Sequence, residues 1–522
     1  MRVCAAPIEA PFRITRPAIR VRPAAVQLAS RMPAESDIYS MSPDSIGKLL
    51  KLALLPLSAA LMVTAGCGGN MVASNGGTQS SSNTGPAFVV GTDAPAPLPS
   101  VVGVKIQLES IVLTNGSTKS NNLLVNPVTV DFARFNGLQG LVDMNDVQTG
   151  TYTGVTIGLG TSNEIDYLNT SAAPPTISTI APTLTTSTVN ITLNNPLKVS
   201  ATGGVPVGLR MDLDLGQSIE TSGGGITGTI NPTFDVKTVA RTDNGAHIDE
   251  FIGSVTTAPS SATATSFVIT GPHGEAFTIN ISSSTEWDGG ASQSQLISDG
   301  SNAIVMVAGQ FDPADQTLDA DEISILSDTG FYAGGLVTYV TPATGAATDM
   351  QFYVRHVLPS GLSAVPLGGI ANVSITGNEK YGIYWMHNAF TNLLFNDAAM
   401  TAGQEISVGG SDPTASPITV KRIHLRNWGY NGTIVAGSRN AAQGTFKMNV
   451  KGFAGQVIPS PITVYLGTGA DFRYGFGAIS DLTDGASIRV VGILLKYNGQ
   501  TVLVARHIDG LTLTDTAVTA WQ

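Results

Sequence analysis

Residues 101–113 read VVGVKIQLESIVL, and within them the apolar residues Val104, Ile106 and Leu108 alternate with polar ones. A β-strand points successive side chains to opposite faces, so a period of two is typical of a strand with one buried face. The same alternation recurs at residues 209–215, which read LRMDLDL. The sequence therefore indicates half-buried β-strands.

Short strands of this kind are expected throughout residues 87–243. Residues 128–130, 152–159 and 189–193 alternate in the same way, and clusters of Gly, Pro and Asn separate them. Many short strands joined by polar turns are typical of an antiparallel β-sandwich. Residues 138–145 are a candidate for a short helix within this domain.

Several short motifs mark this first domain. They are GTDAP at 91–95, IVL at 111–113, VDFA at 130–133, the segment 138–141 and GTY at 150–152. As a set, these motifs resemble the bacterial envelope family known as domain of unknown function 4382. The resemblance covers roughly residues 87–240. It implies a β-rich envelope domain and brings no activity with it.

A second pattern occurs three times in the rest of the chain. Each copy opens with a glycine close to an apolar strand, at Gly253, Gly335 and Gly432. Alternating strands follow, and glycines lie where the strands of a small barrel would bend. These units resemble another β-rich envelope domain of unknown function that is often found in tandem. We expect them at residues 248–327, 330–427 and 428–515.

The sequence thus predicts an all-β protein, with an N-terminal antiparallel β-sandwich followed by three tandem small β-barrel (OB-like) repeats. Closing a sheet into a barrel removes its exposed edges. Plain sandwich repeats are the alternative. Of the 522 residues, 42% are hydrophobic, which is enough for folded cores. The net charge of −11 argues against nucleic acid as a partner, because such binding needs a basic surface.

An export signal is expected ahead of this fold, at residues 41–66. Lys48 and Lys51 form its positive start, and residues 52–63 form its apolar core. The stretch TAGC at 64–67 then resembles the lipobox of bacterial lipoproteins, with Thr where Leu is usual. Small residues before the cut fit the signal peptidase, and the thiol of the cysteine can be acylated.

The resemblance implies cleavage between Gly66 and Cys67 and a palmitate-bearing lipid on Cys67. An ordinary signal peptide, in which the cysteine has no role, is the alternative. Residues 52–66 are only fifteen uncharged residues, whereas a membrane-spanning helix needs about 20. Residues 1–40 either precede the true start at Met41 or extend the positive region of the signal.

Residues 67–86 are expected to form a flexible tether, because they are rich in Gly, Ser, Thr and Asn and contain few apolar side chains. The expected location is the bacterial cell envelope, with the chain anchored through its lipid. Gly68 follows the cysteine where an Asp would favour the inner membrane, so the outer membrane is favoured. The membrane is therefore an expected partner.

The sequence offers few candidates for catalytic chemistry. It lacks the spacings of serine-hydrolase, zinc-protease, P-loop and EF-hand motifs. The expected mature chain keeps one cysteine, which excludes disulfides and cysteine metal sites. Its histidines show no metal-ligand spacing: His247, His273, His356, His387, His424 and His507. We therefore expect no enzyme, no cofactor and no metal site.

Two acidic groups are the candidates for an exception to this expectation. Asp212 and Asp214 share one face of a predicted strand, where they could hold a cation or act as a carboxylate pair. A second group at residues 312–322 lacks the order of a calcium loop. We interpret both as solvated faces or turns.

Tyr381, Tyr384 and Trp385 are the candidate ligand-binding residues, because exposed aromatic rings can stack on sugars or enter a partner's pockets. A local core under a long loop is the competing interpretation. Three functions remain open at this point. They are a lipid-anchored envelope protein with non-catalytic β-modules for binding or structural presentation, a glycan-binding lipoprotein, and an enzyme with an unrecognised carboxylate site. A glycan and an envelope protein are accordingly the candidate partners besides the membrane.

Overall fold

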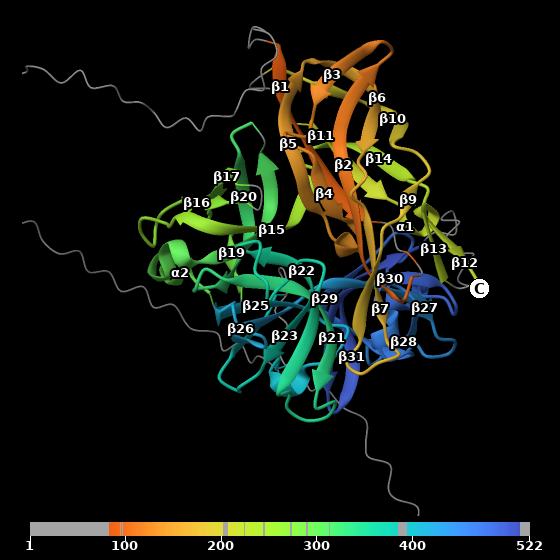
Figure 1. Ribbon diagram of the computed structural model, residues 1–522, viewed down its shortest axis with the longest axis vertical. Helices are drawn as coiled ribbons and strands as arrows, with labels where there is room; N and C mark the ends of the chain where they lie inside the picture. Colours follow the sequence, from red (N-terminus) through yellow and green to blue (C-terminus); the bar gives the residue numbers. More distant parts are fainter. Residues whose placement is uncertain are drawn as a thin grey trace, which may run out of the picture. The chain divides into compact units, whose positions relative to one another are not determined.

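The computed structural model describes residues 83–511 except 94–95, 97, 202–206, 224, 244–245, 272–273, 289–290, 313 and 385–393. The described chain is all-β and contains several sheets, as the sequence predicts (Figure 1). The described residues belong to one compact unit. The expected signal peptide, Gly66, Cys67 and Trp385 all lie outside the described residues. None of the described helices is long and apolar enough to span a bilayer.

The first domain contains two sheets that share one apolar core. β1 pairs with β11 in parallel and with β5 in antiparallel fashion, so the smaller sheet is mixed. The smaller sheet has the order β14 (Phe234–Ala240), β11 (Val207–Leu213), β1 (Thr84–Asp93) and β5 (Gly140–Gln148). The larger has the order β10 (Thr188–Val199), β6 (Gly150–Leu159), β2 (Val101–Asn115), β7 (Glu164–Asn169) and β8 (Thr176–Ile180).

Smaller elements complete this domain. β3 (Thr118–Asn122) and β4 (Val128–Asp131) both pair with β2, and a 3-10 helix, η2 (Phe132–Phe135), follows β4. A third small sheet has the order β12 (Ile219–Ser222), β13 (Gly225–Ile230) and β9 (Thr183–Leu184), and a one-turn helix α1 (Leu215–Ser218) precedes it.

The helix expected at residues 138–145 is wrong. Most of this segment belongs to β5, which pairs with β1 over residues 140–148. Pairing with a neighbouring strand satisfies its backbone groups, and it places Val142 and Val147 in the apolar core.

The rest of the chain forms three small barrels with one topology. In each, the first strand pairs with the second and fourth, the fifth pairs with the fourth, and a parallel contact between the third and fifth strands closes the ring. This five-strand ring, with its order 1-2-3-5-4, is the small OB-like barrel expected from the sequence.

The first barrel contains β15 (His247–Thr257), β16 (Ser266–Thr270), β17 (Ala276–Asn280), β19 (Ile304–Asp312) and β20 (Thr317–Ser327). The short β18 (Glu286–Trp287) adds to β20, and the helices α2 (Gln293–Asp299) and η5 (Gly300–Asn302) lie between β18 and β19 in the chain.

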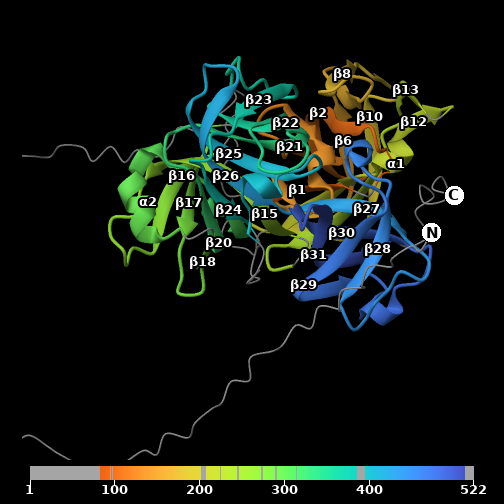
Figure 2. The same ribbon diagram turned by 90° about the horizontal axis from the view of Figure 1, so that it is seen from below.

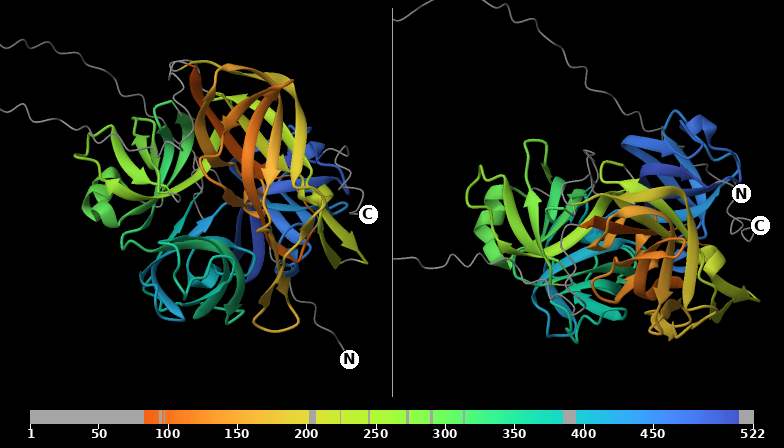
Figure 3. Two further views of the ribbon diagram at one scale, coloured as in Figure 1. Left: turned by 45° about the horizontal axis from the view of Figure 1, so that its top comes forward. Right: turned by 90° about the horizontal axis from the view of Figure 1, so that it is seen from above.

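The second barrel contains β21 (Tyr332–Thr341), β22 (Asp349–Leu358), β23 (Ile370–Ser374), β25 (Glu405–Asp412) and β26 (Ile418–Arg426). Its sixth strand, β24 (Lys380–Ile383), adds to β26, and η6 (Asp397–Ala399) precedes β25. The left view of Figure 3 shows these strands, in teal, curving into a ring.

The third barrel contains β27 (Trp428–Ile434), β28 (Thr445–Val450), β29 (Ile462–Arg473), β30 (Ser487–Tyr497) and β31 (Gln500–Gly510), with two short helices, η7 (Gly455–Val457) and η8 (Ile479–Asp481). Figure 2 shows this barrel in blue. Most of its buried apolar residues belong to the same core as those of the first domain, so this core spans the two modules. Four residues of β30 and β31 instead join the core of the second barrel: Ile493, Leu495, Val502 and Val504.

Candidate functional site

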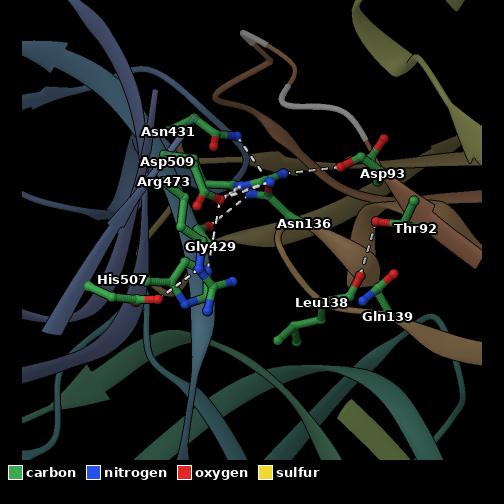
Figure 4. A network of polar contacts seen from close by, with 12 residues as sticks. Thr92, Asp93, Asn136, Leu138, Gln139, Gly429, Asn431, Arg473, His507 and Asp509 are labelled. Carbon is green, nitrogen blue, oxygen red and sulfur yellow. Dashed lines mark hydrogen bonds and ion pairs between the residues drawn. The ribbon is translucent and has the colours of Figure 1, made fainter. Parts of the chain in front are cut away.

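Polar side chains join the first domain to the third barrel (Figure 4). The backbone carbonyl of Asp93, at the end of β1, accepts a hydrogen bond of 3.2 Å from Nη1 of Arg489 on β30. Arg489 in turn donates to the carboxylate of Asp509 on β31, at 2.9 Å. Asp509 is buried, so the pair links two strands of the barrel while the arginine reaches across to the first domain.

A second contact lies beside it and depends on a glycine. Nδ2 of Asn136 donates to the carbonyl of Gly429 at 2.7 Å, and Nδ2 of Asn431 donates to Oδ1 of Asn136 at 3.1 Å. A Cβ atom added to Gly429 would collide with the backbone carbonyl of Asn136. Only glycine therefore allows β27 to approach the first domain so closely.

The side chain of Asp93 is buried, and neither of its carboxylate oxygens has a hydrogen-bond partner. Burial and the neighbouring charge of Asp212 raise the pKa of Asp93 well above its usual value. A carboxyl in such a place is neutral over a wider pH range than an exposed one. This favours a packed structural group over a general base or a metal ligand.

The histidine of this region is also structural. Burial and the nearby Arg473, Arg506 and Arg489 guanidinium groups lower the pKa of His507 to about 2. Its Nε2 lies 3.8 Å from the Asp509 carboxylate, and since the ring is neutral this contact is polar and not a salt bridge. Within the described chain, no group of three or more His, Cys, Asp or Glu side chains is placed to hold a metal ion.

Buried polar groups also join the first domain to the second barrel. The Tyr353 hydroxyl donates to the Asp166 carboxylate at 2.6 Å, and Nζ of Lys105 lies 2.9 Å from the same carboxylate. Burial and the two nearby carboxylates Asp131 and Asp166 raise the pKa of Tyr353 far above its usual value, so its hydroxyl stays a donor.

Arg355 touches three modules at once. Its Nη2 donates to the carbonyl of Val102 in the first domain at 2.9 Å, and its Nη1 donates to Glu405 in its own barrel at 3.1 Å. Its guanidinium carbon also lies 4.7 Å from the ring centroid of Trp428, the first residue of the third barrel. The Arg355 side chain is 1% exposed, so this charge is held almost without water.

Arg426 joins the first two barrels in a similar way. It pairs with Glu250 of β15, and its Nη1 lies 3.2 Å from the Tyr332 hydroxyl. The nearby charges of Glu250, Tyr332 and Glu405 outweigh the effect of burial and raise the pKa of Arg426. Arg355 and Arg426 thus each place a buried charge in a contact between modules.

A cleft lies on the second barrel, at its edge with the first domain. It is lined by side chains of β21, β22 and β23, by the segment before β26, and by Pro174 of the first domain. The residues of the second barrel that line it are mostly neutral: Tyr339, Thr341, Met350, Gln351, Asn372, Val373, Ser416 and Pro417, with Asp349 as the charged member.

The structure contradicts one of the three expected aromatic ligand-binding residues. Tyr384 is 1% exposed, so its ring cannot stack on a ligand in this structure, and its hydroxyl lies 3.4 Å from the carbonyl of Asp249. Tyr381 is half-buried and packs edge-on against Phe395, with ring centroids 5.5 Å apart. Tyr384 is therefore a core residue, which packs against residues of the first barrel, whereas part of the Tyr381 side chain stays exposed. Trp385 lies outside the described residues.

The acidic candidates have structural roles. Asp214 caps α1, since its carboxylate accepts hydrogen bonds from the backbone N and the Nε2 of Gln217 at 2.9 and 2.7 Å. In the group at 312–322, Arg241 pairs with Asp312 and Asp319. These carboxylates are engaged and do not form a carboxylate pair open to substrate.

Sequence reasoning missed the cleft residues. Each of Tyr339, Gln351 and Asn372 has buried apolar neighbours in its strand, so strand alternation signals three outward-facing polar residues. Their closeness depends on strand register, which the alternation of single strands does not reveal.

Comparisons with protein-family models, with curated proteins and with solved structures give no match for this chain.

Proposed function

We propose that this protein is a lipid-anchored protein of the bacterial cell envelope, and that its β-modules form a non-catalytic body for binding or structural presentation. The observation that carries the proposal is the position of three arginine side chains in contacts between modules. Arg355, Arg426 and Arg489 each connect modules, and each has a carboxylate partner. Ionic contacts of this kind between modules hold the outer surfaces of the modules in a fixed arrangement.

The non-catalytic part of the proposal rests on where the perturbed groups lie. Asp93, Tyr353, His356 and Tyr384 have strongly shifted pKa values. Asp93, Tyr353 and Tyr384 are buried, and His356 is partly buried. Shifted pKa values mark catalytic sites when they occur in a cleft that substrate can enter. None of these four residues lines the cleft of the second barrel or the surface pocket around Tyr167 and Gln456.

The envelope location and the anchor rest on the sequence pattern at residues 41–67 and on the tether that follows it. A diacylated or triacylated cysteine holds a protein to a bilayer durably, because several acyl chains are buried together. The TAGC stretch, with Gly68 after it, favours the outer membrane as the site of attachment.

The test of the anchor is fractionation of cells that express the wild type or the Cys67→Ala variant. We expect the wild type in the outer-membrane fraction and the variant in the soluble envelope fraction or as uncleaved precursor. Identical fractionation of the two proteins would contradict the anchor. Protease added to intact cells then shows which side of the membrane the modules face.

The test of the non-catalytic body is limited proteolysis of the purified chain from residue 68 onward. We expect resistance at the module junctions near residues 243, 330 and 427, since buried contacts cross them. Rapid release of separately stable modules would contradict a joined body. A reproducible hydrolase or transferase activity in the same preparation would contradict the absence of catalysis.

A further inference from the structure

The cleft of the second barrel contains a row of polar side chains that crosses three strands. In the strand register, Tyr339 of β21 lies opposite Gln351 of β22, and Gln351 lies opposite Asn372 of β23. Opposite residues on paired strands share one face of the sheet, so these three side chains stand side by side. The flanking Val340, Met350 and Val373 are buried in the barrel, which places the row on the outer face.

A second row lies next to the first and widens the surface. Thr341 is opposite Asp349, and both line the cleft. Ser416 and Pro417, which precede β26, border one side, and Pro174 of the first domain borders another. The first domain and the second barrel both contribute walls, so the cleft needs both modules.

The chemistry of the row suits a ligand with hydroxyl groups. Nε2 of Gln351 donates to Oδ1 of Asn372 at 3.0 Å, which fixes the two amides relative to each other. The Oε1 atom of Gln351 is buried and has no hydrogen-bond partner. A buried acceptor without a partner destabilises the protein unless a donor reaches it. The Tyr339 ring beside it is half-buried and offers an apolar surface.

The charge of the cleft restricts the ligand class. Among the described residues, no lysine or arginine lines it, and its charged group is the exposed carboxylate of Asp349. Phosphate-bearing polymers need cations, and the protein as a whole carries a net charge of −11. An aromatic ring with fixed amides and hydroxyls instead matches the apolar faces and hydroxyl edges of neutral sugar rings.

The place of the cleft in the barrel agrees with this chemistry. The second and third strands and the loop between the fourth and fifth strands are the face on which OB-type barrels bind oligosaccharides and oligonucleotides. Because no lysine or arginine is among the described residues that line the cleft, oligosaccharides are favoured over oligonucleotides.

We propose that the row Tyr339, Gln351 and Asn372 on the second barrel binds a neutral polysaccharide, with the tyrosine stacking on a sugar ring and the amides bonding its hydroxyls. The inference deepens the proposed function, because it names the ligand that the presented surface would take. It differs in position from the Tyr381–Trp385 segment that the sequence suggests.

The experiment is affinity electrophoresis of the purified chain from residue 68 onward in native gels. Separate gels contain hydroxyethyl cellulose, barley β-glucan, xylan, laminarin or dextran as neutral probes, and polygalacturonate as an anionic one. We expect at least one neutral probe to retard the wild type and polygalacturonate to leave it unretarded. Retardation is expected to persist in 0.5 M NaCl, because screening has little effect on binding to an uncharged ligand.

Variants locate the site. Tyr339→Ala is expected to weaken binding about tenfold, and Asn372→Ala several-fold, while Tyr339→Phe keeps the ring and most of the affinity. Tyr465→Ala is the matched control, because Tyr465 is also a partly exposed strand tyrosine but lies on the third barrel. Unchanged circular dichroism and melting temperature establish that each variant is folded.

Two results would overturn the inference. One is that none of the neutral probes retards the wild type, and the other is that Tyr339→Ala binds as well as Tyr465→Ala. Either result leaves the Cys67→Ala fractionation and the proteolysis untouched, so a failure of this site is distinguishable from a failure of the proposed function.

Discussion

At the scale of single residues, His247 links the pH to stability. It lies at the start of β15, with Nδ1 3.6 Å from Asp249 and Nε2 3.2 Å from Asp321. Burial alone would lower the pKa of His247, but the two carboxylates outweigh it and raise that pKa to about 9. The native state therefore binds this proton more tightly than the unfolded chain, whose histidine has a pKa near 6.5.

Because the native pKa is the higher one, His247 stabilises the fold fully below pH 6.5, and this contribution disappears as the pH rises through 9. We expect the loss to be about 2 kcal/mol, since solvent partly screens Asp321. Urea unfolding at pH 6 and pH 9.5 measures it. In His247→Gln the pH-dependent loss should shrink by that amount, and an unchanged slope would contradict the role of the histidine.

Replacing either of two buried aspartates of the first domain by Asn should change the stability of the protein, in opposite directions for the two positions. Asp93 has no hydrogen-bond partner for its carboxylate, whereas Asp166 accepts from Tyr353 and Thr179 and pairs with Lys105. Asp93→Asn removes a group that is unfavourable when ionised, and Asp166→Asn removes a charge that its partners need.

We expect Asp166→Asn to destabilise the protein by about 3 kcal/mol at pH 7. Asp93→Asn should instead raise the melting temperature by about 1 to 3 °C at that pH. Since the native pKa of Asp93 is raised, the penalty in the wild type begins as the pH rises past about 3.8. The difference between Asp93→Asn and wild type should therefore grow from pH 4 to pH 7 in calorimetric scans, and a constant difference would contradict this account.

At the scale of elements, the approach of β27 to the first domain depends on Gly429. A side chain there would meet the Asn136 carbonyl, and backbone cannot give way as a flexible side chain can. Gly429→Ala should lower stability by about 2 kcal/mol or more, as overpacking does in a close-packed core. Gly225→Ala is the control, because its Cβ would make only an ordinary contact, 3.7 Å from the Ser222 carbonyl.

Denaturant midpoints of the two alanine variants check this prediction. Equal midpoints for both variants would show that the joint between β27 and the first domain tolerates a wider spacing. A lower midpoint for Gly429→Ala alone would support the close approach that the Asn136 amide bridges.

Alternation made the strands predictable from the sequence, and the repeated glycines made the three barrels predictable. The segment 138–145 was not, because its identity as a strand comes from pairing with β1, some 50 residues away in the chain. The prediction of an exposed Tyr384 ring is wrong for the same reason, because residues distant in the chain, the carbonyl of Asp249 and residues of the first barrel, cover it. The cleft row depends on register between three strands, which no single strand encodes.

At the scale of the whole molecule, Arg355 is the point where three modules meet. Arg355→Met removes the hydrogen bond to Val102 and the contact with Trp428, and it leaves Glu405 buried without its charge partner. Removing one member of a buried pair destabilises by about 3 to 5 kcal/mol. We expect one thermal transition for the wild type and a broader or split transition for this variant.

The double variant Arg355→Met/Glu405→Leu tests whether the loss comes from the stranded charge. Replacing both members by apolar residues of similar size often restores stability. Calorimetry should therefore show recovery of most of the lost stability. If the double variant is no more stable than Arg355→Met, the lost stability comes from the hydrogen bond to Val102 and the Trp428 contact, and not from the pairing with Glu405.

The shared core of the first domain and the third barrel has a consequence for the order of events during synthesis. Asn136 meets Asn431, and Asp93 meets Arg489, across 295 and 396 positions of the chain. The domain that leaves the ribosome first thus cannot bury its full apolar surface until the last barrel has been made. For most of its synthesis the chain carries an exposed surface that needs protection, and a chain that stops before residue 487 keeps that surface exposed permanently.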